Sequence, residues 1–353
     1  MARRRRASLE SEYGTDRLKL LSHLVPYSDS NRSLSVTMVD AGLCLPEIGA
    51  MKTLLNVLLL LTLPSSAALA QTPTGQDVNA SISGYTYVEP GDTSISIDGP
   101  KIGGEYTGTL SLNEQQHWFM QGNVRGTIGR TTYTGWCSPY LINPNNTSPN
   151  GYELGIGDPS PCSEKGDRDW YLEGRALAGK DLIGTRWTYS PYSGVGLRHL
   201  SNGTTGINGY RTDDYLYIPV GVTARTSVAS RNALALNVEF DPLLHGWQKT
   251  RDSALGGGTI PATPTAPPFT INGFSDVSFA QQRGWAIRAS AKYQVARHWS
   301  MEPYFLHWHV NASKLNSETV SFTVNRLTAE EQIGAYEPLN TTREFGVKLG
   351  FHF

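Results

Sequence analysis

The most regular feature of the sequence is an alternation of apolar and polar positions with a period of two, which predicts β-strands with two different faces. The alternation is clearest at the end of the chain, where Glu344–Phe353 reads EFGVKLGFHF. One face there carries Phe345, Val347, Leu349, Phe351 and Phe353, and the other carries charged residues, glycine and histidine. Contact with lipid on the first face and with a polar lumen on the second accounts for both sets.

The same alternation recurs along the chain and predicts ten strands, the first of them a weaker one near Ser81–Glu89. The rows expected to face outward are Tyr106, Leu110 and Leu112; Trp118, Met120, Val124 and Ile128; Trp170, Leu172, Ala176 and Ala178; Trp187, Tyr189, Val195 and Leu197; Leu216, Ile218, Val220 and Val222; Leu234, Leu236, Val238 and Phe240; Trp285, Ile287, Ala289, Ala291 and Tyr293; and Leu306, Trp308 and Val310. Interleaved polar residues are expected to face a lumen.

The connections between these strands alternate between short and long, as they do in bacterial membrane barrels. The short ones lie near residues 113–116, 179–184, 226–232 and 296–299, and the long ones near 90–100, 130–168, 200–213, 247–279 and 312–341. An even number of strands places both chain ends on the short-turn, periplasmic side and the long loops outside. The Gly- and Pro-rich stretch 256–268 is expected to be a mobile surface loop.

Together these patterns predict an all-β fold, a closed antiparallel transmembrane β-barrel of about ten strands with long extracellular loops. Closure is required because a sheet in lipid must satisfy all of its backbone polar groups internally. The final aromatic residues resemble the C-terminal signature of bacterial outer-membrane barrels, with Phe351 and Phe353 as the matching positions. That resemblance implies a surface-exposed protein of the Gram-negative outer membrane, with membrane lipid and the barrel-assembly machinery as partners.

An export signal precedes the barrel. Met51–Ala70 has one Lys, a short apolar core and small residues before an expected cleavage at Gln71, the layout of a secretory signal peptide. Its apolar core is shorter than the 20 or so residues of a spanning helix. We therefore expect residues 1–50 to be a misassigned start or a disordered extension and residues 71–353 to be the barrel domain. The alternative for Arg3–Arg6 is a basic patch that binds nucleic acid or a membrane surface.

Composition adds a disulfide and argues against a polyanionic partner. The formal net charge is −1 and the pI is near 6.7, so no nucleic-acid partner is expected. Cys137 and Cys162 are the two cysteines after the signal peptide, and in an oxidising compartment they are expected to pair. The bond would constrain the unfolded chain by roughly 3 kcal/mol on the chain-entropy model. We expect no cofactor and no metal site, and the sequence does not specify an oligomeric state.

The residues expected in the lumen carry charges of both signs. They include Glu105, Arg125, Glu173, Arg175, Arg186, Arg198, Glu239, Asp241, Arg288, Lys292, Glu344 and Lys348. A ten-stranded barrel is narrow, so these side chains are expected to pair and fill it. A charged pathway for a small solute is the alternative, whereas a general-diffusion porin would need a wider barrel.

A second hypothesis starts from His199-Leu200-Ser201-Asn202-Gly203. This motif resembles the H-x-S-N-G of outer-membrane phospholipase A and the H-x-S-N of lipid A deacylases. The resemblance implies Ser201 as nucleophile, His199 as its base and an acidic residue a dozen positions on, Asp213 with Asp214 beside it, to orient the imidazole. Calcium would be required only in this case. Phospholipase A of this kind has twelve strands and an Asn as third member, so the pattern matches in part. A turn formed by Ser-Asn-Gly is the alternative.

Two further features bear on the function. Strand number and length resemble the omptin proteases, and Asp167-Arg168-Asp169 is similar to part of their aspartate set, but the sequence contains no Asp-x-His. His307 and His309 share a strand face, where lumenal hydrogen bonding is expected over metal binding. We therefore expect a non-enzymatic barrel with a structural, adhesive or narrow-pore role. The alternative is a lipid serine hydrolase that uses His199 and Ser201.

Overall fold

The computed structural model describes residues 71–353 except 92–93, 204–209, 230–231, 256 and 296–297. The predictions for residues 1–50 and for the signal peptide at 51–70 lie outside the described residues. Within them, no helix has the length and apolar character needed to cross a membrane.

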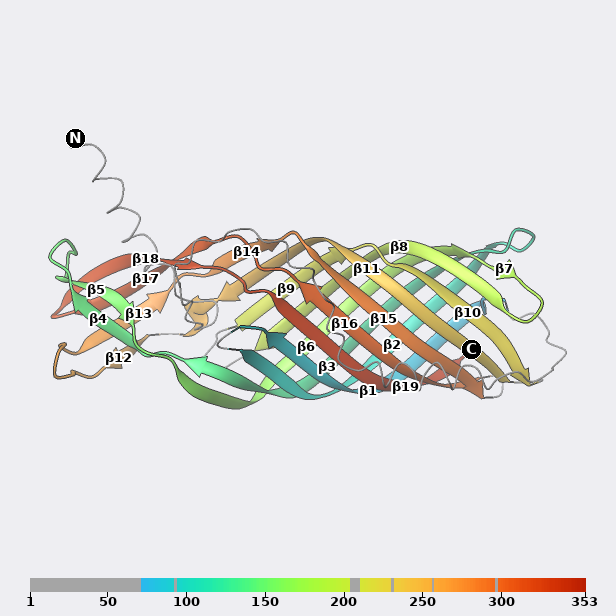
Figure 1. Ribbon diagram of the computed structural model, residues 1–353, viewed down its shortest axis with the longest axis horizontal. Helices are drawn as coiled ribbons and strands as arrows, with labels where there is room; N and C mark the ends of the chain where they lie inside the picture. The colour runs from blue at the N-terminus through green and yellow to red at the C-terminus, as the bar shows by residue number, and fades with distance from the viewer. Residues whose placement is uncertain (1–70, 92–93, 204–209, 230–231, 256, 296–297) are drawn as a thin grey trace, which may run out of the picture.

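Ten strand positions form a closed antiparallel barrel, as the alternation predicts (Figure 1). In chain order they are β1 (Gly75–Glu89), β2 (Ile95–Asn113), β3 (Trp118–Cys137), β6 (Ser160–Lys180), β8 (Thr188–Gly203), β9 (Tyr210–Tyr217) followed by β10 (Val220–Ala229), β11 (Asn232–Arg251), β15 (Gly284–Val295), β16 (Trp299–Val310) and β19 (Asn340–His352). β9 and β10 occupy one position, because both pair with β8 on one side and with β11 on the other. The short β7 (Leu182–Ile183) and β14 (Val277–Gln281) pair with β8 and β11.

The barrel closes where the first strand meets the last. β1 pairs with β19 from Asp77 opposite His352 to Val88 opposite Thr341. Beyond this ladder, the backbone N–H groups of Gln76 and Phe353 donate to each other's carbonyl oxygens, at 3.0 and 2.9 Å. Gly75 has φ +125°, and a Cβ there would lie 2.9 Å from the Phe353 carbonyl oxygen, so a larger residue would open this seam. No sheet edge is left at the closure.

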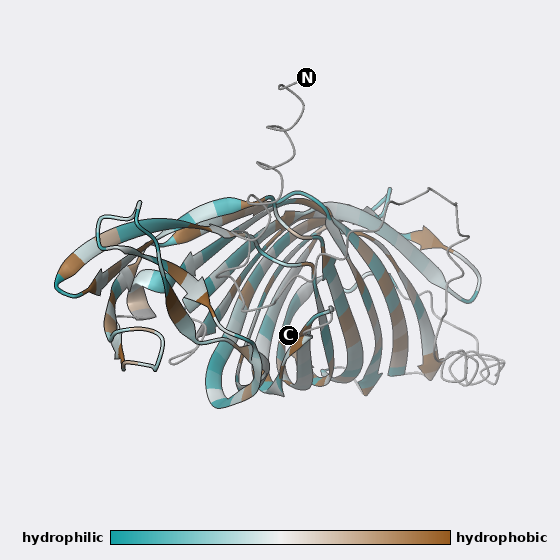
Figure 2. Ribbon diagram, turned by 60° about the vertical axis from the view of Figure 1, so that its left-hand side comes forward, coloured by the Kyte–Doolittle hydropathy of each residue, from teal (hydrophilic) through white to brown (hydrophobic). Residues whose placement is uncertain are grey.

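The outer face of the barrel is apolar. On β19 the predicted row is confirmed, and Phe345, Leu349 and Phe353 are each more than half exposed. Figure 2 shows apolar and polar segments alternating along the barrel strands. Trp118 and Trp299 lie near the short turns, Trp285 lies at the opposite end of β15, and Trp170 lies at the middle of the long strand β6. A closed sheet with an exposed apolar face and aromatic residues toward both ends is the architecture of a transmembrane β-barrel.

The predicted orientation of β16 is wrong. Leu306, Trp308 and Val310 point into the lumen and are no more than 1% exposed, whereas His307 and His309 lie on the outer face. The inward row packs in an apolar cluster with Tyr215, Tyr217, Leu243 and Ala286. The error arose because both rows of β16 contain large apolar residues, and a period of two separates the rows without showing which one faces the lumen.

Three of the long connections contain further strands. At the end of the barrel away from the C-terminus, they form a hairpin of β4 (Tyr140–Pro144) and β5 (Tyr152–Ile156) and a sheet in the order β12 (Gly258–Ile260), β13 (Phe269–Phe274), β17 (Asn316–Val324), β18 (Leu327–Ala335). We call these six strands the cap, and the barrel end with the short turns the turn end. The loops expected at 130–168, 247–279 and 312–341 therefore contain strands. The 3₁₀ turn η1 (Asp252–Leu255) leads from β11 toward the cap.

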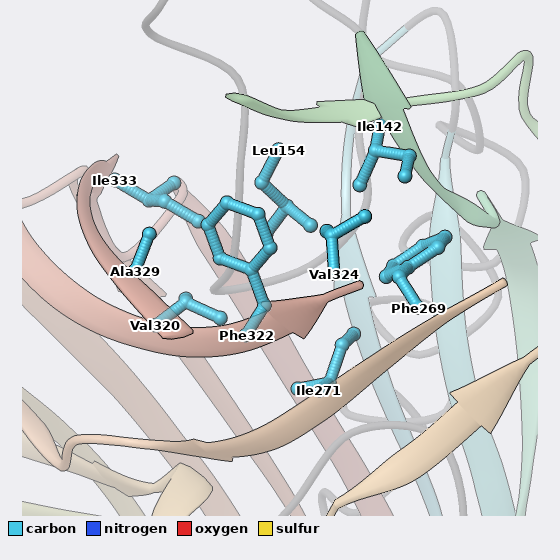
Figure 3. Close-up of a cluster of buried hydrophobic side chains, with 9 residues drawn as sticks. All are labelled: Ile142, Leu154, Phe269, Ile271, Val320, Phe322, Val324, Ala329 and Ile333. Carbon is cyan, nitrogen blue, oxygen red and sulfur yellow. The ribbon is translucent and has the colours of Figure 1, made fainter. Parts of the chain in front are cut away.

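The cap has its own apolar core. Nine buried side chains from the hairpin and the sheet meet there: Ile142, Leu154, Phe269, Ile271, Val320, Phe322, Val324, Ala329 and Ile333 (Figure 3). The inward row of β17 supplies Val320, Phe322 and Val324, alternate positions of one strand. The hairpin and the sheet are distant in sequence, so this shared core is what fixes them together.

Candidate functional site

The His199 motif lies on the outer face of the barrel, toward the cap. His199 is directly opposite Asp214 in the β8–β9 ladder, and its Nδ1 lies 2.7 Å from Asp214 Oδ1. The two side chains are 38% and 51% exposed, so the pair faces outward and does not enter the lumen. A carboxylate at this distance from Nδ1 fixes the orientation of the imidazole and leaves Nε2 as the nitrogen available to a substrate or a hydroxyl.

Ser201 lies two residues further along β8, on the same outer face as His199. It is opposite Trp170 of β6 and Thr212 of β9, and the Trp170 ring lies 5.2 Å from the His199 ring. In the described part of the chain no hydrogen bond joins Ser201 to His199. Such bonds between nucleophile and base often tighten only when substrate is bound. The three side chains therefore share one outward patch without forming a closed relay.

Asp213, the acidic residue expected beside His199, points to the opposite side of the wall. It is 3% exposed and lies near the buried group formed by Arg211, Glu89 and Glu337. Arg211 Nη1 lies 2.8 Å from Glu337 Oε1 and 3.4 Å from Glu89 Oε1. Neighbouring residues of a strand face opposite sides. The structure thus places Asp214, rather than Asp213, in contact with His199.

The charged residues of the lumen pair with each other across it. Lys348 lies 2.9 Å from Glu105, Arg125 lies 2.7 Å from Glu344, and Arg175 lies 2.8 Å from Glu239. Arg288 contacts three carboxylates at once, those of Glu173, Glu239 and Asp241, at 2.5, 3.1 and 2.6 Å. Lys101 pairs with Asp169 in the same manner. The predicted inward charges all face the lumen except Arg186, which is exposed in the turn before β8.

Tyrosine hydroxyls complete this network. Tyr171 and Tyr304 donate to the two oxygens of Glu344 at 2.8 and 2.6 Å, and Tyr217 donates to Glu173 at 2.6 Å. A carboxylate that receives both a guanidinium and phenol groups is compensated for the loss of water, which an isolated buried charge would not be. These contacts join β3 and β6 on one side of the barrel to β15 and β19 on the other, so they cross-link the wall through its interior.

The lumen opens into a polar cavity of about 270 Å³ on the turn-end side of these ion pairs. Its lining includes Asn79, Gln121, Asn123 and Lys292, and the first described residues, Gln71–Pro73, also contribute. The backbone N–H of Thr72 donates to Asp181 Oδ2 at 2.7 Å, and Arg225 donates to the Thr72 hydroxyl at 3.0 Å. The segment before β1 is therefore fastened inside the turn-end mouth of the barrel.

A buried acidic pair joins Glu318 of the cap to Asp252 of η1. Burial, together with repulsion from Asp252, raises the pKa of Glu318 to about 9. Burial and the charge of Asp276 raise the pKa of Asp252 to about 7. Asp276 behaves differently because the Ser253 hydroxyl donates to it at 2.6 Å and Lys249 lies 3.0 Å away, and its pKa is lowered. Glu318 is consequently a neutral acid at pH 7.

The predicted disulfide is present. Cys137 at the end of β3 is bonded to Cys162 near the start of β6, with Cα atoms 5.7 Å apart. The bond closes the segment that contains the β4–β5 hairpin, so it ties this part of the cap to the barrel wall.

The two histidines of β16 flank an outer-face tryptophan. The rings of His307 and His309 lie 5.3 and 5.5 Å from that of Trp285, so these histidines belong to the outer surface and not to the lumen, where hydrogen bonding was expected. In the residues that the structure describes, no group of three or more His, Cys, Asp or Glu side chains is placed to hold a metal ion.

Two features of the site could not be read from the sequence. The contact between His199 and Asp214 depends on the β8–β9 register, which places the two residues directly opposite each other. The Arg211, Glu89 and Glu337 group joins residues more than 120 positions apart. Only the alternation of β9, which places odd-numbered residues inward, carried a signal that Asp213 faces the lumen.

Comparison with known proteins gives structural likenesses only. No protein-family model matches the sequence, and no curated protein matches it. Among solved structures, the chain is similar to the outer membrane protease OmpT from Escherichia coli, with TM-score 0.45, 10% identity and coverage of 82% of this chain and 100% of that one. It is also similar to an outer membrane channel from Pseudomonas putida F1 (TM-score 0.35, 10% identity, 82% and 100% covered) and to the outer membrane protein OprG from Pseudomonas aeruginosa (0.30, 11%, 81% and 100%). At these values nothing about the activity of this chain follows from them.

Proposed function

We propose that this chain is an integral outer-membrane barrel with a closed lumen, which acts through the cap that it presents outside the cell. The observation that carries the proposal is the contrast between a lumen crossed by ion pairs and a cap with its own core. A barrel that served as a wide pore would need its interior free of such cross-links. A structural or adhesive role therefore fits better than diffusion of solutes.

The lumen offers two obstacles to passage. Arg288 with its three carboxylates, and Arg125 with Glu344, lie in the middle of the barrel, and the Thr72 segment lies in the turn-end mouth. A solute would have to separate buried opposite charges to pass, and breaking a buried pair costs about 3–5 kcal/mol. The cavity between these obstacles is therefore a dead end when the network is intact.

The cap presents a surface with a fixed conformation. Its hairpin and sheet share an apolar core, and the Cys137–Cys162 bond fastens the hairpin side to the wall. Mobile loops would present many conformations, whereas a packed sheet presents one. A fixed polar surface outside the membrane is what recognition or adhesion requires.

Site-directed labelling tests the orientation. Ala262 in the cap and Gln115 in a turn-end connection are both exposed. In intact cells, a membrane-impermeant maleimide should label Ala262→Cys and leave Gln115→Cys unlabelled until the outer membrane is permeabilised. The reverse pattern would refute the proposed topology. Single-channel recording should then give no steady conductance, and large stable openings would refute the closed lumen.

A second candidate function is lipid hydrolysis, which the His199–Asp214 contact favours. Ser201 would attack an acyl ester at the membrane surface, and His199 would accept its proton and pass it to the departing lipid alcohol, while Asp214 held the imidazole. Water activated by His199 would then hydrolyse the acyl-serine and release the fatty acid. Purified full-length chain should then release fatty acid from a phospholipid or from lipid A, with calcium supplied. Ser201→Ala should abolish the release and Asp214→Asn should lower kcat at least a hundredfold. Thr212→Ala, on the same face, is the matched control, and equal activity in all variants would dismiss the site.

A further inference from the structure

Three cations gather on the outer face of β3 and β6, just on the cap side of Trp170. Arg130 and Arg168 are directly opposite each other in the β3–β6 ladder, and both are exposed. Lys165 is also exposed, and it lies opposite Thr132, two residues beyond Arg130 along β3 toward the cap. The ladder shifts register between Thr131 and Thr132, beside Gly166 with φ +91°. That shift brings Lys165 to the same outward face as Arg168.

This arrangement is unfavourable for the protein alone. Residues directly opposite in an antiparallel pair have Cα atoms about 4.5–5.5 Å apart, and like charges in such a pair are destabilising. Arg130 donates to the backbone carbonyl of Gly166 at 3.1 Å, and in the described part of the chain it forms no salt bridge with a carboxylate. Among the residues that the structure describes, one outward acid adjoins the group, Asp98 of β2, opposite Thr132, and Asp214 of β9 is already paired with His199. An anion with more than one acceptor oxygen could bind both arginines at once and neutralise their repulsion.

The surface beneath the cations is apolar. Ile128 and Val124 of β3, Leu172 of β6 and Leu197 of β8 are exposed on the outer face, toward the turn end. Trp170, directly opposite Ile128 in the β3–β6 ladder, lies next to the cations on their turn-end side, where a tryptophan at a membrane–water boundary is expected. A ligand that covered both regions would need a multivalent anionic head and apolar chains.

We propose that Arg130, Arg168 and Lys165 bind the phosphate headgroup of a membrane lipid of the cap-side leaflet, with its acyl chains along Ile128, Leu172 and Leu197. Guanidinium groups recognise phosphate with paired hydrogen bonds, and two facing guanidiniums fit the oxygens of one phosphomonoester. Binding neutralises the repulsion across the β3–β6 ladder. The site does not depend on hydrolysis at Ser201.

The test uses full-length protein purified in a zwitterionic detergent and native mass spectrometry with phosphatidic acid, phosphatidylcholine or oleate as probes. Wild-type protein should retain phosphatidic acid over the other two. Arg130→Gln/Arg168→Gln should weaken that binding about thirtyfold. Each interfacial cation contributes about 1 kcal/mol to lipid binding, and about 1.4 kcal/mol corresponds to a tenfold change in affinity. The control Arg186→Gln/Lys314→Gln removes equal charge at exposed positions elsewhere and should bind as wild type does.

Two outcomes would overturn the proposal. Equal retention of phosphatidic acid by the double variant and its control would show that the site does not bind the lipid. Displacement of bound phosphatidic acid by millimolar inorganic phosphate would assign the site to a soluble anion. Urea unfolding in the same detergent provides a readout that separates binding from structure. Arg168→Gln should unfold at an equal or higher urea concentration than wild type, because it relieves repulsion. A lower midpoint would mean that Arg168 has a structural role instead.

Discussion

The lumen of the barrel and the core of the cap are both buried, but they are held by opposite chemistry. In the lumen, Arg288 and Arg125 join carboxylates from strands on opposite sides of the barrel, with tyrosine hydroxyls completing the network. In the cap, Phe322 and its eight neighbours bury apolar surface and contain no charge. The difference follows from the surroundings. In the barrel strands the apolar row faces lipid and the polar row faces the lumen, whereas cap strands outside the membrane bury their apolar row and expose their polar row.

The comparison predicts which part of the fold is destabilised when a contact of each kind is lost. An ion pair in the lumen links strands that are far apart around the barrel, so its loss affects the wall as a whole. An apolar contact in the cap links only the hairpin to the sheet. The predictions below test that difference, beginning with the largest expected effect.

The first prediction concerns the lumen. Arg288→Ala should lower the free energy of unfolding of the barrel by about 3–5 kcal/mol, because Glu173, Glu239 and Asp241 lose a shared cation while they remain buried. Urea unfolding in detergent, followed by tryptophan fluorescence, measures the change. Lys314→Ala, at an exposed position, is the control and should stay within about 0.5 kcal/mol of wild type. An unchanged midpoint for Arg288→Ala would mean that the network does not brace the wall.

The second prediction concerns the cap. Phe322→Ala should cost the cap about 3 kcal/mol, from lost burial and a cavity between the hairpin and the sheet, while barrel unfolding stays as in wild type. Hydrogen exchange of the β17 and β18 amides reports the cap, and urea unfolding reports the barrel. Leu327→Ala, which trims an exposed leucine of β18, should alter neither. Coupled loss of both would show that cap and barrel unfold as one unit.

The third prediction concerns the dependence of the cap on pH. The raised pKa of Glu318, about 9, means that the folded cap holds a proton which the unfolded chain releases near pH 4.5. Stability is therefore greatest in acid and falls as the pH rises from about 5 to about 9. The rate of proteolysis in the cap should increase over this range relative to Glu318→Gln, which cannot ionise. Parallel profiles for the two proteins would contradict a protonated Glu318.

Sequence reasoning reached the barrel because lipid imposes a period of two on every spanning strand, and the row from Phe345 to Phe353 repeats it without interruption. It reached the disulfide because two cysteines remain after the predicted export signal. It also placed His199 and Ser201 on one outward face. It did not identify Asp214 as the partner of His199. The alternation of β9 puts Asp214 on the outward face with Leu216, but the contact itself depends on the β8–β9 register.

The sequence by itself determined the number of spanning strands, their alternating faces and the charge of the lumen, because these follow from the solvent that each side of a strand meets. Only the tertiary structure decided that Trp308 faces inward, that the long connections build a cap around Phe322, and that Arg130 lies opposite Arg168. Each of these depends on register and on contacts between distant segments. A period of two repeats identically in every register, so it cannot select among them.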